Sequence, residues 1–298
     1  MALRPGCAIG STPFGAKDAA PIRRVGTDGN DKYVDLPMQW RDPDMAAAPA
    51  LPDDVFRAVD RLTVGEYAAF AGHLARPDDP RPAVPAEALL DASMRAAISA
   101  RFARRFQDFD ARAALSIWIK WYINVIVPPA LLCDLLLRLR LPLSLAHTAF
   151  IIGDDSRVAA VKIGGSPDDV TGADPFDRFR HLIFDHFEPL IELWSARSDV
   201  TRRVLWSNVG NTFEAMLAKI GAVSGRMDRL EDARWLMDQP LWNDGQPNPI
   251  YAAVHYVERA GESIRLRRVC CLQYLLPDRR FCKACPVEEP REQIRAEP

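Results

Sequence analysis

Four of the six cysteines in this 298-residue chain lie between positions 270 and 285. Cys270 and Cys271 are adjacent, ten residues follow, and Cys282 and Cys285 then form a Cys-x-x-Cys pair. Four thiolates brought together make an all-sulfur ligand set, which suits an iron–sulfur cluster or a structural zinc ion. A fold that uses this set has to turn the backbone back on itself near the end of the chain.

The composition limits the kinds of partner. Hydrophobic residues make up 48% of the chain and charged residues 26%, which is the usage of an ordinary globular protein. The formal net charge is -2, so no overall positive field attracts nucleic acid, and we expect no nucleic-acid partner. Electrostatic recognition has to come from local groups of charges.

The N-terminal residues indicate a cytoplasmic protein. They contain no apolar core of a secretory signal and are broken by Pro5 and Pro13. A thiol cluster without export predicts a reducing compartment, where the cysteines serve a metal rather than disulfides. The apolar run Trp121–Cys133 holds thirteen residues, fewer than the ~20 that a membrane span needs, and is expected to be a buried or interfacial helix.

The chain is expected to have three regions. Residues 1–85 have an irregular start, with an ordered piece around Tyr33–Trp40, then short helices in Leu51–Ala75 and a Pro-rich linker at 76–85. Residues 86–245 form a mainly helical body with a β-hairpin near 147–164, and residues 246–298 form a C-terminal module that contains the four cysteines. The predicted fold class is therefore α+β, mainly helical with a small antiparallel sheet.

Several boundaries follow from turn and capping residues. The hairpin in the body is expected to turn at 153–156 (GDDS), and a second hairpin at 260–262 leads the chain to Cys270. Asp174-Pro175 predicts the start of a helix, Pro189 an interruption, and Asp199 the cap of the helix that carries Val204–Leu217.

Spacing alone leaves the metal open. Cys282 and Cys285 form the usual knuckle for one metal, but neighbouring side chains on an extended strand point to opposite faces, so Cys270 and Cys271 can both bind only if the backbone bends locally. Sulfurs spread in this way reach the two irons of a [2Fe–2S] cluster more easily than one tetrahedral zinc ion. Structural zinc, which usually takes two Cys-x-x-Cys knuckles, and a protein without metal remain alternatives.

The same residues resemble a known family. The runs Arg267–Tyr274 (RRVCCLQY) and Phe281–Pro286 (FCKACP) are similar to the C-terminal signature of the FhuF-type ferric-siderophore reductases. Leu205–Asn211 (LWSNVGN) resembles the Trp-x-Asn helix of that family, and Ile117–Leu143 is also similar, so the resemblance covers the chain from position 90 or so to 286. It implies that Cys270, Cys271, Cys282 and Cys285 hold a [2Fe–2S] cluster.

The resemblance also implies an activity. A ferric-siderophore reductase passes one electron to siderophore-bound Fe(III), and Fe(II) is held much more weakly by hard oxygen donors. The sequence contains neither GxGxxG after a strand nor GxxxxGK[ST], so electrons are expected from a separate donor protein or reductant. No catalytic residue is expected beyond the cluster ligands.

Further residues are candidates for substrate contact. Arg267, Arg268, Arg279 and Arg280 surround the cysteines, together with Arg265 and Lys283, and either dock an anionic siderophore or an acidic electron donor or form a solvated basic surface. Trp206 and Asn208 have either structural roles or contact the substrate.

Other side chains suggest membrane contact or a second metal. Trp118, Trp121 and Tyr122 are either core residues or a patch against the cytoplasmic face of the inner membrane, which ferric siderophores cross on their way in. His181 and His186 lie five residues apart, a poor spacing for one face of an α-helix, and are expected at a surface or interface rather than at a metal.

Two alternative functions remain open. An iron–sulfur electron carrier or sensor would hold the same cluster without a siderophore site. A zinc-stabilised binding protein would hold a colourless, redox-silent metal on the same cysteines.

Overall fold

The computed structural model describes residues 51–106, 109–259, 261–277 and 279–287. The chain divides into residues 1–33 and 34–298, and every described residue belongs to the second unit. The ordered piece expected around Tyr33–Trp40 lies outside the described residues.

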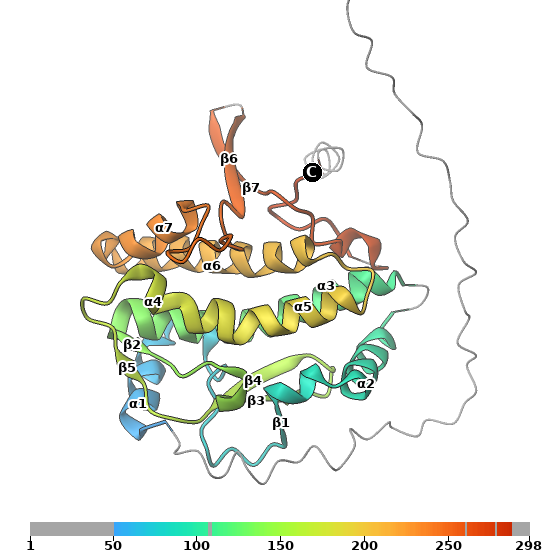
Figure 1. The fold of residues 1–298 in the computed structure, drawn as a ribbon, viewed down its shortest axis with the longest axis horizontal. Coiled ribbons are helices and arrows are strands. Elements are labelled where there is room, and N and C mark those ends of the chain that lie inside the picture. Colours follow the sequence, from blue (N-terminus) through green and yellow to red (C-terminus); the bar gives the residue numbers. More distant parts are fainter. Residues whose placement is uncertain (1–50, 107–108, 260, 278, 288–298) are drawn as a thin grey trace, which may run out of the picture. The chain divides into compact units, whose positions relative to one another are not determined.

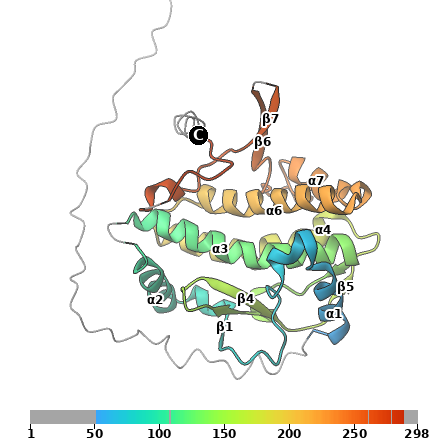
Figure 2. The same ribbon diagram turned by 180° about the vertical axis from the view of Figure 1, so that it is seen from behind.

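Two long helices form the centre of this unit. α3 (Ala111–Leu132) packs along α6 (Arg202–Ser224), and Figures 1 and 2 show the pair from opposite sides. The Asp110 carboxylate caps α3 by accepting hydrogen bonds from two backbone N–H groups of the first turn. The cap of α6 is Thr201 rather than the expected Asp199. The Thr201 hydroxyl accepts a hydrogen bond from the backbone N–H of Val204, three residues further along the chain.

An antiparallel sheet with strand order β1-β3-β4 packs against α3 (Figure 1). β3 (Thr148–Ile152) and β4 (Val158–Ile163) form the hairpin that the turn residues predict. β1 (Ala83–Pro85) pairs with β3, so the end of the stretch expected to be a linker is an edge strand of the body. An edge position tolerates Pro85, since its missing N–H is not needed by an inner strand.

One continuous helical run follows the sheet. It consists of α4 (Pro175–Arg180), the π-helical turn η7 (His181–Phe187) and α5 (Glu188–Ala196), and Asp174 caps its start as predicted. The interruption expected at Pro189 does not occur. Pro189 follows the wider π turn and lies in the first turn of α5, where a missing N–H removes no hydrogen bond.

The second predicted hairpin consists of β6 (Val254–Arg259) and β7 (Glu262–Arg267). This hairpin projects away from α6 in Figures 1 and 2. The described chain is thus α+β and mainly helical, as predicted. The shorter helices and strands are α1 (Asp53–Leu62), η3 (Gly65–Phe70), η4 (Ala86–Leu90), α2 (Ala92–Ala103), η5 (Cys133–Leu137), β2 (Leu139–Arg140), η6 (Leu145–His147), β5 (Asp168–Asp169), η8 (Met227–Arg229), α7 (Glu231–Asp238) and η9 (Gln273–Leu275).

The apolar helix expected to be buried or interfacial is a core helix. Within the described part of the chain, the segment Ala111–Leu137 is long and apolar enough to cross a bilayer, but 78% of its most apolar window is buried inside the protein. Trp118 and Tyr122 are almost fully buried, and Trp121 is half-buried with the Arg157 guanidinium over its ring. These aromatic side chains therefore do not form an exposed patch for a membrane, and membrane contact of the protein stays a prediction.

Close packing at Gly210 joins α6 to the chain that enters β6. A Cβ at Gly210 would overlap the Cβ of Ala253 and lie 3.5 Å from Ile250. We expect Gly210→Ala to lower the free energy of unfolding by about 1–3 kcal/mol, because the overlap outweighs the better helix propensity of alanine. Urea unfolding measures the change. Gly221→Ala is the matched control in the same helix, because its closest neighbour, at 2.9 Å, is the terminal Cδ1 of the Leu230 side chain rather than a Cβ. A loss as large in this variant would contradict the account.

Candidate functional site

The cysteine segment, residues 270–285, lies against the N-terminal halves of α3 and α6. Ser116 of α3 donates a hydrogen bond through its hydroxyl to the carbonyl of Cys271 (2.9 Å), and Ser207 of α6 donates to the carbonyl of Val269 (3.1 Å). Lys120, one turn after Ser116, donates through Nζ to the side chain of Gln273 (3.4 Å). The segment is thus fixed to both central helices through polar groups.

The backbone bends at both cysteine pairs. Leu272 follows Cys271 with φ 63°, a left-handed conformation that is uncommon for a residue with a side chain. Its N–H donates to Sγ of Cys270 at 3.3 Å. The N–H of Cys285 donates to the carbonyl of Cys282 at 2.9 Å, which closes the turn of the Cys-x-x-Cys pair. The local bend that two adjacent cysteine ligands require is therefore present.

A buried arginine lies beside these thiols. Arg267, the last residue of β7, is 1% exposed, and no described carboxylate forms an ion pair with it. Its Nη2 donates to Asn208 Oδ1 (2.6 Å) and Ser207 Oγ (3.2 Å), while Nε and Nη1 have no acceptor among the described residues. Burial lowers the pKa of Arg267, and the charges of Cys271, Cys282 and Cys270 act in the opposite direction.

The charge on the cysteines differs from one thiol to the next. The neighbouring Cys282 thiol, and then Arg267 and Lys120, lower the pKa of Cys271, whereas burial raises the pKa of Cys270, and the neighbouring Cys271 together with burial raises the pKa of Cys282. A guanidinium stays protonated in a protein, and a buried cation without a counter-charge is costly. Cys271, Cys282 and Cys270 would supply this counter-charge when ionised.

Asn208 connects this arginine to α3. Its Nδ2 donates to both the carbonyl and the hydroxyl of Ser116 at 3.1 Å, while its Oδ1 accepts from Arg267. The Asn208 side chain is fully buried. A chain of hydrogen bonds therefore runs from Arg267 through Asn208 and Ser116 to the carbonyl of Cys271.

A polar stripe on α3 is the sequence signal for this network. Ser116, Lys120 and Asn124 recur every four residues in an otherwise apolar helix, and this spacing puts them on one face. In the structure Ser116 and Lys120 bind the cysteine segment, and Asn124 accepts from Thr212 of α6 at 3.0 Å. A polar stripe on an apolar helix marks the face that meets the C-terminal segment.

The donor set fits an iron–sulfur cluster chemically. The five described cysteines are free thiols, and four of them are the cysteines of the segment. Thiolates near two cations, with a backbone N–H donating to sulfur, are the surroundings in which clusters are held and their potentials tuned. Among the described residues, no group of three or more His, Cys, Asp or Glu side chains is arranged closely enough to hold a metal ion.

The other arginines near the cysteines differ in exposure. Arg268, Arg279 and Arg280 are exposed, as is Lys283, and none of them forms an ion pair with another described residue. Arg265 is already paired, since its guanidinium donates to the carboxylate of Glu214 and to Asn211. These four exposed side chains place positive charge on the cysteine segment and at the residue two positions before it.

The remaining candidates lie in the interior. Trp206 is 3% exposed and packs in the core, so a substrate contact of Trp206 or Asn208 stays a prediction. His186 is fully buried, and burial lowers its pKa to about 4. Nδ1 of the neutral ring donates to the carbonyl of Leu143, so Nε2 accepts a hydrogen bond from the Tyr122 hydroxyl (2.7 Å). The expected surface or interface position is therefore wrong for His186, which the π turn places in the core.

Fold and site together define a mainly helical α+β protein whose C-terminal four-cysteine segment is held over a buried arginine. The family described as "Ferric iron reductase FhuF-like transporter" matches residues 116–264, half of the chain, and this chain belongs to that family. The matched range ends before Cys270.

Two further proteins are similar to this chain. A ferric siderophore reductase of Escherichia coli (strain K12) is 27% identical over 175 residues, which are 58% of this chain and 65% of that relative, less than two thirds of its length. The ATP-bound aerobactin synthetase IucA from a hypervirulent pathotype of Klebsiella pneumoniae superimposes with a TM-score of 0.46 at 12% identity, covering 68% of this chain and 50% of that one.

Proposed function

We propose that this protein is a cytoplasmic ferric-siderophore reductase, in which Cys270, Cys271, Cys282 and Cys285 hold a [2Fe–2S] cluster. When bound, such a cluster supplies one electron at a time. The observation that carries the proposal is Arg267, a buried cation that forms no ion pair with a described carboxylate and whose charge the cysteines Cys271, Cys282 and Cys270 would offset when ionised. Family membership and the named relative support the activity.

The residues of the chain have distinct tasks in this proposal. The four cysteines bind the cluster, and the Arg267–Asn208–Ser116 network fixes the segment on α3 and α6. Arg267 and Lys120 offset the negative charge that grows on reduction. The siderophore-bound Fe(III) gains one electron and becomes Fe(II), which the oxygen donors release, and no bond of the organic ligand breaks.

The electron comes from a separate one-electron donor. The exposed basic side chains are suited to an acidic donor protein, and they are Arg268, Arg279, Arg280 and Lys283. The association rate of such a donor should rise as the ionic strength falls. Peripheral association with the cytoplasmic face of the membrane, where siderophores enter, is part of the proposal and does not depend on the buried aromatic residues.

The test is spectroscopic. Protein purified without oxygen should be brown, contain about two irons and two sulfides per chain, and bleach with a spin-half EPR signal after dithionite. The reduced protein should then convert a ferric siderophore to Fe(II), detected with a chromogenic Fe(II) chelator. A colourless preparation that contains zinc and takes up no cluster would overturn the proposal. A redox-active cluster that reduces no ferric siderophore would indicate an electron carrier or sensor instead.

A further inference from the structure

The cysteine segment carries an aromatic pair that the network of Arg267 does not use. The rings of Tyr274 and Phe281 stack with 5.0 Å between their centroids and 14° between their planes, and Tyr274 is 38% exposed. Aromatic side chains are enriched at the centre of protein interfaces, because they bury a large area at a low cost in side-chain entropy. An exposed aromatic pair beside a redox site is therefore a candidate contact for a partner protein.

The opposite side of the segment is turned toward the helices. Ser116 and Lys120 of α3 bind it through Cys271 and Gln273, and Leu276 is 3% exposed and packs in the core. A partner can therefore reach the segment only from the side that these contacts leave open.

Each pair of cysteines has one buried and one half-buried member. Cys271 and Cys285 are 1% and 3% exposed, whereas Cys270 and Cys282 are half-buried. Phe281 directly precedes Cys282, so the aromatic pair is joined to a cysteine that solvent also reaches. A redox protein that contacts the aromatic pair would thus come close to the outer part of the ligand set.

Positive charge flanks the aromatic pair along the chain. Arg279 and Arg280 immediately precede Phe281, and Lys283 follows it by two positions. All three cations are exposed, and none of them forms an ion pair with a described carboxylate. The stretch 272–285 carries these three cations against one carboxylate, a formal charge of +2. A negatively charged partner is therefore favoured here.

The backbone under these side chains is fixed. Gln273 Nε2 donates to the carbonyl of Arg280 (2.9 Å), and Gln273 Oε1 accepts from Lys120 of α3 (3.4 Å). The N–H of Arg279 donates to the carbonyl of Leu276 (3.2 Å). A partner that binds these residues would not have to order the backbone first, which lowers the entropic cost of binding.

The four residues Tyr274, Phe281, Arg279 and Arg280 are called the aromatic–basic patch below. We infer that this patch docks the acidic electron-donor protein, and that the electron enters the four-cysteine site there. The inference rests on the proposed function and locates its partner. Aromatic side chains flanked by arginines suit the small, transient contacts of electron-transfer proteins. On contact the donor is oxidised by one electron and the four-cysteine site is reduced by one, while no covalent bond forms or breaks.

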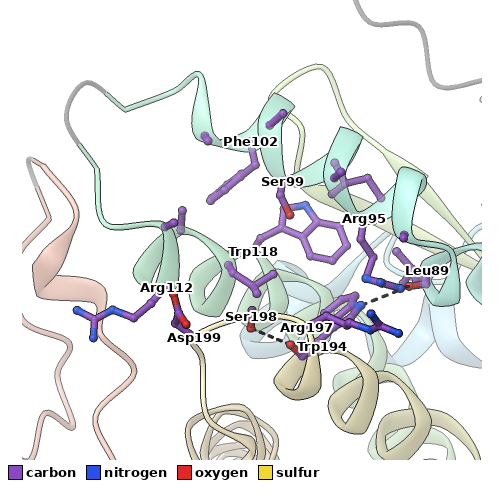
Figure 3. Close-up of a pocket in the computed structure, with 18 of the residues that line it drawn as sticks. Leu89, Arg95, Ser99, Phe102, Arg112, Trp118, Trp194, Arg197, Ser198 and Asp199 are labelled. Atoms are coloured by element: carbon purple, nitrogen blue, oxygen red, sulfur yellow. Dashed lines mark hydrogen bonds between the residues drawn. The ribbon is translucent and has the colours of Figure 1, made fainter. Parts of the chain in front are cut away.

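A cavity of about 600 Å³ between α2, the first turns of α3 and the segment that joins α5 to α6 is a poor alternative for a protein partner (Figure 3). Its aromatic lining residues Phe102, Trp118 and Trp194 are at most 3% exposed, so they offer almost no surface for contact. No residue of the aromatic–basic patch lines this cavity.

The test uses an acidic plant-type [2Fe–2S] ferredoxin as the probe, with full-length protein loaded with its cluster. Isothermal titration calorimetry with both proteins oxidised measures binding without turnover. Tyr274→Ala should weaken binding about tenfold at every ionic strength, because it removes an apolar anchor. Arg280→Glu should weaken binding about tenfold at low ionic strength and far less in high salt, since salt screens the charge. A basic cytochrome c should not bind.

Two exposed side chains outside the segment provide matched controls. Tyr251 is 47% exposed in the chain that follows α7, and Arg61 is exposed on α1. Figures 1 and 2 show both helices away from the cysteine segment. Tyr251→Ala and Arg61→Glu should bind ferredoxin like the unmodified protein. The visible spectrum of all four variants should show full cluster content, so weaker binding does not report a loss of the fold.

Stopped-flow mixing with reduced ferredoxin extends the test to electron entry. The second-order rate of cluster reduction should fall about tenfold in Arg280→Glu at low ionic strength. Equal ferredoxin binding in the unmodified protein and both patch variants, or no binding to the unmodified protein, would overturn the inference. A raised KM for a ferric siderophore in Arg280→Glu, with unchanged ferredoxin binding, would overturn it in favour of a chelate site.

The proposed function is tested without the donor, so the two failures are distinguishable. Unmodified protein reduced with dithionite needs no docking partner. If this protein reduces no ferric siderophore, the proposed function fails, whatever ferredoxin binding shows. If it does so while ferredoxin ignores the patch, only the docking site is wrong.

Discussion

Cys282→Ser should abolish both cluster assembly and ferric-siderophore reduction. A serine hydroxyl is not ionised near neutral pH and is a harder ligand than a thiolate, so one of the four proposed cluster ligands is lost. Iron and sulfide content after anaerobic reconstitution, with the visible spectrum, measures assembly. Cys285→Ser should give the same result.

Cys133→Ser is the matched control. Cys133 is fully buried at the start of η5, and burial raises its pKa to about 12, so it is a neutral thiol in the core. A buried serine in a helix can donate to a preceding carbonyl, which limits the cost of the change. This variant should keep the cluster and the activity. Full iron content with an unchanged rate in Cys285→Ser would contradict the ligand assignment, and loss of cluster in Cys133→Ser would show that the assay reports folding instead.

Local patterns were sufficient to predict much of the fold. Apolar periodicity located α2, α3 and α6, and turn residues located both hairpins, because neighbouring residues decide these features. The boundaries that failed depend on distant groups. Pro189 remains within a helix because a π turn precedes it, and β1 exists only because β3 supplies its hydrogen bonds.

The site shows the same division. The spacing of the four cysteines identified the segment, but nothing in that spacing reveals that Arg267 is buried while Arg268 is exposed. β7 ends at Arg267 and its last two residues are both buried, so the exposure of Arg268 depends on where the hairpin ends in the tertiary structure. Asn208 belongs to a motif that is visible in the sequence, whereas its partner Ser116 lies 92 positions away and is brought to it only by tertiary packing.

Arg267→Met should lower the reduction potential of the proposed cluster by about 60–120 mV, one to two tenfold steps for a one-electron couple. Reduction adds negative charge, and a buried cation with free Nε and Nη1 groups stabilises the reduced form most in a site shielded from water. Methionine keeps much of the side-chain volume without the charge. An EPR-monitored redox titration measures the shift, which does not depend on any siderophore.

Two further variants show whether charge, rather than packing, sets this potential. Arg267→Lys keeps the charge but not the planar fork, and should recover at least half of the potential lost in Arg267→Met. Arg265→Gln removes a cation two residues earlier on β7 that Glu214 already neutralises, and should shift the potential far less. An Arg267→Met protein that assembles its cluster at the original potential would exclude electrostatic tuning by Arg267. Equal shifts in Arg267→Met and Arg265→Gln would mean that the buried guanidinium has no greater influence on the electron affinity of the site than a paired arginine of the same strand.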